Sequence, residues 1–332
     1  MTGQRTRRQF LADLGSAAAA ASVSSTPWAA AALAGPERPC PRVAIARDDA
    51  LARGNIDEHY LLLRRLLDAA VQKVTGAPTA AAAWRGLFRP SERIGIKVNT
   101  LGLSTQPGVA AAIAEGLQSG DVPAENIVIW DRFDVELAQA GFRLNKSSRG
   151  VRCYGTDSEE IGGGYQSRIE TSGAIGSCFS KIVAEQVDAL ICVPVLKDHN
   201  LAGVSLGLKN FYGAIHNPNK YHDNNCDPYV ADVVSHRFIG SKWRLTVCDA
   251  TRAQYHGGPS PHPGFAWPFG GLIVGTDFVA TDAVAADLLE AERKAKGLQP
   301  LGAEKRPTRH IASAGARGLG EADLSGIDRI EV

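Results

Sequence analysis

Apolar residues are concentrated in five short runs that are typical of buried β-strands. These runs cover residues 93–98, 126–130, 188–195, 244–248 and 271–274. Other stretches carry apolar residues at intervals of three and four, which predicts helices. The predicted helices cover residues 61–74, 107–117 and 280–296. Because strands that alternate with helices usually form a parallel sheet covered on both faces, we predict an α/β fold with a mostly parallel sheet.

Polar or ionisable residues come directly after four of the five predicted strands. They are Asn99, Asp131, the run Lys197-Asp198-His199, and Asp249. Ligands of open parallel sheets bind beyond the carboxyl ends of the strands, where loops hold side chains on a rigid scaffold. For any one of these Asp residues, capping of the helix that follows it is the alternative role. As a set these residues predict a shared cleft, lying between two lobes at about residues 40–150 and 180–332.

The densest group of ionisable residues lies between residues 195 and 222. It contains three histidines and three lysines, namely His199, His216, His222, Lys197, Lys209 and Lys220. Histidine is the commonest metal ligand and the usual acid/base near neutral pH. A lysine in a cleft can bind anions or act as a base. A glycine-rich connection with solvated charges is the alternative, but this density directly after a buried strand favours a functional site.

Two later segments are further candidates for the same cleft. His256 to His262 is a turn-rich loop shortly after Asp249, and exposed loop histidines are its alternative interpretation. Asp277 to Asp282 follows the fifth predicted strand and opens a helix. A carboxylate at the start of a helix is favourable to the helix dipole, so capping explains at least one of these two Asp residues without a functional role.

The composition of the 332-residue chain is that of an ordinary globular protein, with 44% hydrophobic and 21% charged residues. The formal net charge is +1, which gives no indication of nucleic acid or an anionic membrane as a partner. Six cysteines are present, and no two of them form a C-x-x-C pair. We therefore do not expect an iron–sulfur cluster. The predicted cleft makes a small molecule the expected ligand.

The N-terminus has the layout of a twin-arginine export signal. Arg7-Arg8 precede Phe10-Leu11, a weakly apolar stretch of small residues follows, and Ala32-Leu33-Ala34 fits signal peptidase. We predict a signal at residues 1–34 and a mature α/β domain at residues 35–332, located in a bacterial periplasm or cell envelope. The export machinery is then a partner, and a stable membrane anchor is not expected, because the stretch has few large apolar residues. A disordered alanine-rich tail is the alternative.

Several short motifs occur in an order that resembles domain-of-unknown-function family 362 (DUF362). They are Lys97-Val98-Asn99, Asp131, the stretch from Lys197 through Lys209-Asn210 to Gly213, Asp249-Ala250, the stretch from Gly275 to Val284, and Gly318-Leu319-Gly320. The resemblance extends from about Arg93 to the C-terminus. Some members of that family carry ferredoxin-like cysteine clusters, which this chain lacks, and the family name assigns no activity.

The stretch from His199 to Lys209 is also similar to a motif of nickel-dependent lactate racemases. The shared positions are His199, Ala202, Gly203, Ser205, Gly207 and Lys209, followed by Gly213-Ala214-Ile215. In that family the histidine is an acid/base and the lysine anchors a nickel–pincer nucleotide, so the resemblance implies these roles for His199 and Lys209. Leu206 and Tyr212 replace the family's Gly and Pro.

We hypothesise an exported enzyme that acts on a small anionic substrate by proton or hydride transfer next to a carboxylate, as in a racemase or an oxidoreductase. The expected catalytic residues are His199, Lys209 and Asp198. The expected cofactor-binding residues are Lys97, Asn99, Lys197, Lys209 and Asn210. A divalent metal (nickel, iron or zinc) is expected at His199, His216, His222 and Asp249. A non-catalytic periplasmic metal or ligand carrier and an assembly factor for an exported enzyme remain alternatives.

Overall fold

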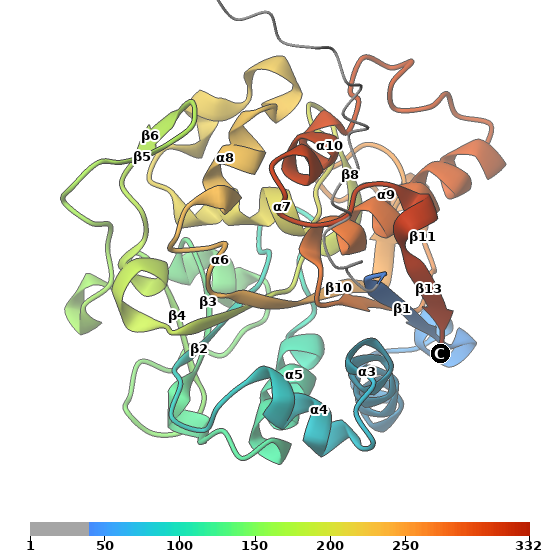
Figure 1. Cartoon of the computed structure of the whole chain (residues 1–332). Coiled ribbons are helices and arrows are strands. Elements are labelled where there is room, and N and C mark those ends of the chain that lie inside the picture. The colour runs from blue at the N-terminus through green and yellow to red at the C-terminus, as the bar shows by residue number, and fades with distance from the viewer. Residues whose placement is uncertain (1–39) are drawn as a thin grey trace, which may run out of the picture. The chain divides into compact units, whose positions relative to one another are not determined.

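The fold is that of a computed structural model, which describes residues 40–332; the predicted export signal lies outside the described residues. Residues Cys40–Val332 group into one compact unit, and one large sheet runs through it (Figure 1). The two lobes predicted from the sequence are therefore not confirmed. No helix within residues 40–332 has the length and apolar character needed to cross a membrane.

The sheet has eight strands along its main path, in the order β13-β1-β12-β10-β7-β2-β3-β4. These strands are β1 (Arg42–Arg47), β2 (Ile94–Lys97), β3 (Ile127–Asp131), β4 (Arg152–Gly155), β7 (Ala189–Cys192), β10 (Trp243–Gln254), β12 (Gly271–Gly275) and β13 (Asp328–Glu331). Off this path, β8 (Val195–His199) and β11 (Ala266–Trp267) pair with β10, and β9 (Gly203–Val204) pairs with β8. A separate hairpin pairs β5 (Glu170–Ser172) with β6 (Ile175–Ser177). Along the main path only β12 pairs antiparallel with its neighbours, which confirms the mostly parallel sheet.

Helices cover both faces of the sheet, as predicted (Figure 1). They are α2 (Asp49–Arg53), α3 (Tyr60–Thr75), α4 (Ala80–Leu87), α5 (Pro107–Ser119), α6 (Asp134–Gln139), α7 (Gly207–Asn210), α8 (Tyr229–Ser235), α9 (Phe278–Ala295) and α10 (Arg309–Ala316). Alternate residues of β1 enter two different cores: Ala44 and Ala46 pack with α3, α4 and α5, whereas Val43 and Ile45 belong to the core that contains α7 to α10. This alternation follows from the two-residue period of a strand.

The antiparallel direction of β12 changes the position of Asp277. Strands β2, β3, β7 and β10 share one direction, so the end of β12 lies at the opposite edge of the sheet from Asn99. The Asp277 carboxylate accepts a hydrogen bond from the backbone N–H of Ala280 at 2.9 Å and caps α9. The expectation that Asp277 joins the cleft is therefore wrong, and its capping role explains it.

Candidate functional site

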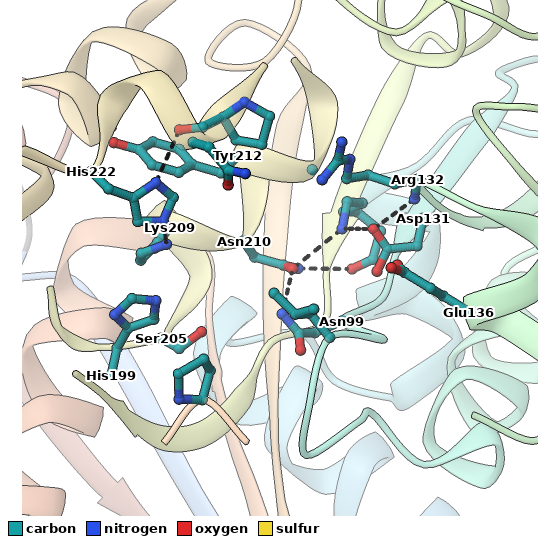
Figure 2. A pocket seen from close by; sticks show the side chains of 16 residues that line it. Asn99, Asp131, Arg132, Glu136, His199, Ser205, Lys209, Asn210, Tyr212 and His222 are labelled. Atoms are coloured by element: carbon teal, nitrogen blue, oxygen red, sulfur yellow. Dashed lines mark hydrogen bonds and ion pairs between the residues drawn. The ribbon is translucent and has the colours of Figure 1, made fainter. Parts of the chain in front are cut away.

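A cavity of about 110 Å³ lies at the carboxyl edge of the parallel strands. Asn99 and Asp131 reach it from the ends of β2 and β3, and His199 reaches it from the end of β8. Lys209 and His222 come from α7 and from the turn η5 (Pro218–Tyr221) and its C-cap. The strand ends and the segment rich in His and Lys therefore meet in one place (Figure 2).

A buried ion pair joins the ends of β2 and β3 at the cavity wall. The Nζ atom of Lys97 lies 2.7 Å from Oδ1 of Asp131. The other carboxylate oxygen of Asp131 accepts hydrogen bonds from the backbone N–H and the hydroxyl of Thr100, at 2.8 and 2.9 Å. Gly213 passes so close to this pair that an added Cβ would lie 2.9 Å from Nζ of Lys97. The pair is fully hydrogen-bonded, so it holds the two strand ends and the Gly213 segment together.

The remaining residues expected to bind a cofactor form a buried polar network among themselves. The side-chain amide of Asn99 donates to Oδ1 of Asn210 at 3.2 Å (Figure 2). Lys197 donates to Oδ1 of Asn99 at 2.8 Å and to the carbonyls of Leu101 and Leu103 at 2.6 and 2.7 Å. Burial lowers the pKa of Lys197 to about 7. Its three oxygen acceptors nevertheless each need an N–H donor, which only the ammonium form supplies, so Lys197 is charged in this arrangement. Lys197 thus holds the loop after β2 in place.

A second cavity, of about 330 Å³, lies on the other side of the same loop. Leu101 and Pro259 line the smaller cavity. Leu103 and Pro261, from the same two loops, line the larger one. The backbone N–H of Leu103 donates to the Pro259 carbonyl at 3.1 Å, which joins the two loops. These loops, residues 99–106 and 256–262, form the partition between the cavities.

Lys209 and His222 form the most distinctive contact of the smaller cavity. Nζ of Lys209 lies 3.2 Å from Nε2 of His222. Nδ1 of His222 lies 3.0 Å from the Pro218 carbonyl, which can only accept, so Nδ1 carries the ring proton and Nε2 accepts from Lys209. Burial lowers the pKa of Lys209 to about 8 and also lowers the pKa of His222. Lys209 forms no ion pair with any carboxylate of residues 40–332.

The start of α7, which carries Lys209, is fixed by a carboxylate. Asp282 accepts hydrogen bonds from the backbone N–H groups of Gly207 and Leu208, both at 2.8 Å. Burial raises the pKa of Asp282 to about 7. Asp282 therefore fixes the helix that carries Lys209, whereas Asp277 caps α9 and also accepts from the backbone N–H of Glu321 at 3.0 Å.

His199 is fixed as a neutral hydrogen-bond donor. Its Nδ1 accepts from the backbone N–H groups of Leu201 and Ala202, at 3.1 and 3.2 Å. The ring proton therefore resides on Nε2. Burial, reinforced by the charge of Lys209, lowers the pKa of His199 to about 2. This arrangement suits a neutral donor to a substrate oxygen rather than the acid/base role that the lactate racemase resemblance implies.

Asp198 points away from the cavity, in contrast to its expected catalytic role. Successive side chains of a strand face opposite sides, so Asp198 lies on the other side of β8 from Lys197 and His199. Its carboxylate accepts from Arg306 at 2.5 Å and from the backbone N–H of Gly258 at 2.7 Å. Asp198 is therefore a buried structural anion.

The four residues expected to bind a metal are not brought together. His199 and His222 face each other with ring centroids 5.9 Å apart. His216 is exposed and packs edge-on against Tyr165. Asp249 accepts from the backbone N–H of Gln106 at 2.8 Å and from Thr251, and it does not line the cavity. Asp249 therefore ties β10 to the residue that precedes α5, and it does not cap the helix that follows it in the chain.

The described residues do not fit a nickel–nucleotide group. Within residues 40–332, no three His, Cys, Asp or Glu side chains are placed to hold a metal ion. Pockets for ligands of drug or nucleotide size have volumes of roughly 300 Å³ or more, whereas the cavity beside Lys209 has about 110 Å³. A divalent metal therefore remains a prediction from the sequence.

Sequence reasoning missed three ionisable residues at the site. Arg132 and Glu136 line the cavity, and Arg132 directly follows Asp131, so its position after a strand was a usable signal. His310 on α10 is fully buried, and neither of its ring nitrogens has a hydrogen-bond partner among the described residues. Burial, with the nearby charge of Lys209, lowers the pKa of His310 to about 3. No local pattern marks His310, because it lies in a helix far along the chain.

The cavity-lining residues fall within a single region of family similarity. The sequence model of a family described as a domain of unknown function (DUF362) matches residues 94–287. The chain belongs to the DUF362 family. The DUF362 region contains every residue that lines the smaller cavity, while Arg306 and His310 lie beyond it.

Other comparisons add little to the DUF362 assignment. No curated protein matches the chain. Among solved structures, a Thermotoga maritima protein of known crystal structure is similar, with a TM-score of 0.43 and 11% sequence identity. The similarity covers 69% of this chain and 59% of the other, so the chain spans less than two thirds of that protein's length.

Proposed function

We propose that this DUF362 protein is an enzyme that transfers a proton at a carbon atom of a small anionic substrate held in the smaller cavity. The observation that carries the proposal is the contact between Lys209 and His222. A buried amine whose pKa is lowered to about 8 exchanges protons readily near neutral pH. It contacts a neutral imidazole rather than a carboxylate, so its neutral form is accessible as a base.

The proposed step needs only the chain's own residues. Neutral Lys209 takes a proton from a carbon next to a carbonyl or carboxyl group; the C–H bond breaks, an N–H bond forms, and the electron pair moves onto the oxygen. The Nε2–H of His199 supports a hydrogen bond to that oxygen, where negative charge develops. His222 orients the amine through Nε2. The ammonium group of Lys209 exchanges its hydrogens with solvent, and return of a proton from it to the carbon re-forms the C–H bond, so the carbon acquires a hydrogen from solvent.

Hydrogen exchange in D₂O tests this proposal. Proton NMR would follow the loss of C–H signal from pyruvate, lactate and malonate with the wild-type chain and with Lys209→Met. Lys220→Met is the matched control, because Lys220 is exposed and lies in the same segment but outside the cavity. We expect loss of Lys209 to slow exchange by about 10²-fold or more and the control to leave it unchanged. Equal rates in wild type and Lys209→Met would refute the proposal.

The same experiment separates an enzyme from a carrier. Binding of an acid that undergoes no exchange with the wild-type chain would favour the non-catalytic ligand-binding protein. Elemental analysis of protein purified from its native compartment belongs with this test, because a stoichiometric metal would restore the metal-site prediction.

We propose further that the protein functions in a bacterial periplasm or cell envelope. The support is the sequence alone: Arg7-Arg8 and the Ala32-Leu33-Ala34 end of the N-terminal segment. Replacement of both arginines by lysine is expected to leave the full-length chain in the cytoplasm. Fractionation and the mass of the mature N-terminus measure this directly, and unchanged export of the double variant would contradict it.

A further inference from the structure

Arg132 presents to the smaller cavity a guanidinium that has no ion-pair partner among the described residues. Within residues 40–332 its side chain forms no ion pair, and its buried Nε atom has no hydrogen-bond partner. Figure 2 shows the guanidinium of Arg132 on one side of the cavity and Lys209 with His222 on the other, with Asn210 between them. Because no carboxylate pairs with this guanidinium, an anionic ligand in the cavity is favoured as its partner.

The position of Arg132 is set by its neighbours. Its backbone N–H donates to Oδ1 of Asp131 at 2.8 Å, next to the ion pair with Lys97. Its guanidinium carbon lies 4.7 Å from the centre of the Phe133 ring, over which it stacks. A guanidinium held in this way keeps its fork of donors in one orientation and loses little side-chain entropy when it binds.

The charge balance of the cavity favours an anion. Lys97 and Asp131 neutralise each other, which leaves Arg132 and Lys209 as cations on its walls. The one further acid on the wall is Glu136, whose carboxyl group accepts from the hydroxyl of Thr100 at 3.3 Å. Burial raises the pKa of Glu136, and the neighbouring Asp131 adds to this effect. With Glu136 ionised, the two cations and the one carboxylate leave one positive charge, so an anion with one negative group complements the cavity.

We propose that Arg132 binds the carboxylate of the substrate in a bidentate manner, and that the substrate is a short monocarboxylic acid. A planar fork of N–H donors matches a carboxylate with two parallel hydrogen bonds. The cavity volume of about 110 Å³ equals that of roughly four water molecules, which gives room for an acid of about two to four carbons. That its reacting carbon lies near Lys209 rests on the proposed function; the carboxylate site itself does not.

A binding experiment that needs no turnover tests the carboxylate site. Isothermal titration would compare propionate with propionamide, which has nearly the same shape but no charge, and with inorganic phosphate. We expect propionate to bind the wild-type chain at least tenfold more tightly than propionamide or phosphate. Arg132→Gln and Arg132→Lys should each weaken propionate binding at least tenfold, because neither side chain offers the fork of donors.

Arg149→Gln is the matched control, because Arg149 is exposed and lies outside the cavity. It should bind propionate as the wild type does, and thermal unfolding of each variant shows whether the fold is kept. The assignment is overturned if the wild-type chain fails to bind propionate, if a folded Arg132→Gln binds it equally well, or if phosphate binds in its place. Loss of binding in Arg132→Gln together with undiminished hydrogen exchange in Lys209→Met would retain the carboxylate site and refute the proposed function.

Discussion

Nζ of Lys209 lies 3.2 Å from Nε2 of His222, and the carbonyl of Pro218 fixes the ring so that Nε2 faces the amine. One residue comes from α7 and the other directly follows η5, so the contact depends on the fold of the whole segment between them. It places a proton donor and a proton acceptor next to each other inside a cavity.

The first prediction concerns the pH dependence of hydrogen exchange. The base is the neutral form of Lys209, whose pKa is lowered to about 8. The exchange rate should therefore rise with pH and reach a plateau above about pH 8. His199 should contribute no inflection near neutral pH, because its pKa is lowered to about 2. A pH profile of the exchange rate, measured by NMR, checks both statements, and a rate that falls as the pH rises from 6 to 9 would contradict them.

The second prediction concerns the stability of the Lys209→Met variant. The pKa of Lys209 is about 8 in the folded chain and near 10.5 when unfolded, so wild-type stability is lost as the pH falls from about 10.5 to 8. At pH 7 the variant should be more stable than the wild type by up to ~3 kcal/mol. The gain is reduced by loss of the cation–π contact between Lys209 and the Tyr212 ring, whose centre lies 4.6 Å from Nζ. Urea unfolding at pH 7 and pH 10 measures this, and the gain should shrink at the higher pH. A variant less stable at pH 7 would show that the charged form is favoured.

The third prediction concerns Gly213. An added Cβ would lie 2.9 Å from Nζ of Lys97 and 3.0 Å from Oδ1 of Asp131, two atoms held by several hydrogen bonds. Gly213→Ala should destabilise the chain by ~1–3 kcal/mol, as other overpacked sites do. Gly86→Ala is the control, because an added Cβ there meets nothing within 4 Å and should stabilise α4 by ~0.5–1 kcal/mol. Denaturant unfolding compares the two, and equal effects would remove the packing argument.

The fourth prediction concerns the buried pair of Asp198 and Arg306, whose side chains are 0% and 8% exposed. Arg306→Met should destabilise the chain by ~3 kcal/mol or more, because it leaves a buried carboxylate without its cation. The double variant with Asp198→Asn should lose less than the sum of the two single variants. Arg329→Met, which breaks an exposed pair with Asp287, should cost no more than ~1 kcal/mol. Additive single effects in a double-mutant cycle would argue against the pair.

The fifth prediction concerns His310. Its pKa is lowered to about 3 by burial, so the folded chain holds it neutral, and stability is lost as the pH falls from about 6.5 to 3. His310→Leu should reduce this loss and leave stability at pH 7.5 unchanged or higher, because two unpartnered ring nitrogens leave the core. Thermal unfolding at pH 7.5 and 4.5 tests it; a variant destabilised at both values would indicate that the ring has a partner.

The five apolar runs predicted as strands are strands of the sheet, but other strands were missed, including β1 (Arg42–Arg47), which has a short apolar run of its own. β13 (Asp328–Glu331) has a mostly exposed, charged sequence that carries no strand signal. The direction of β12 depends on its connection to β10, which a local pattern does not encode. Because Asp277 follows β12, its position in the fold depends on that direction as well. The alternation along β8 similarly decides that His199 faces the cavity and Asp198 does not.

Part of the candidate site follows from sequence and part depends on tertiary packing. His199 and Asn99 reach the cavity because they lie at the carboxyl edge of the sheet, as the strand-end pattern indicates, whereas Lys209 reaches it from α7. His216 lies in the same segment but is exposed. The turns between Gly213 and His222 direct the side chains of this segment to different sides, so His222 faces the cavity and His216 does not. His310 comes from α10, and only packing brings it near Lys209.

The loops that divide the two cavities are distinct from the elements that carry the proton-transfer residues. Lys197 holds one of the two loops through the carbonyls of Leu101 and Leu103 rather than through their side chains. The side chains of the partition are thus free to vary without loss of its anchor. The proton-transfer residues stand on β8, on α7 and at the end of η5, apart from these loops. Substitutions in these loops would therefore change the walls of both spaces while leaving the reacting groups where they are.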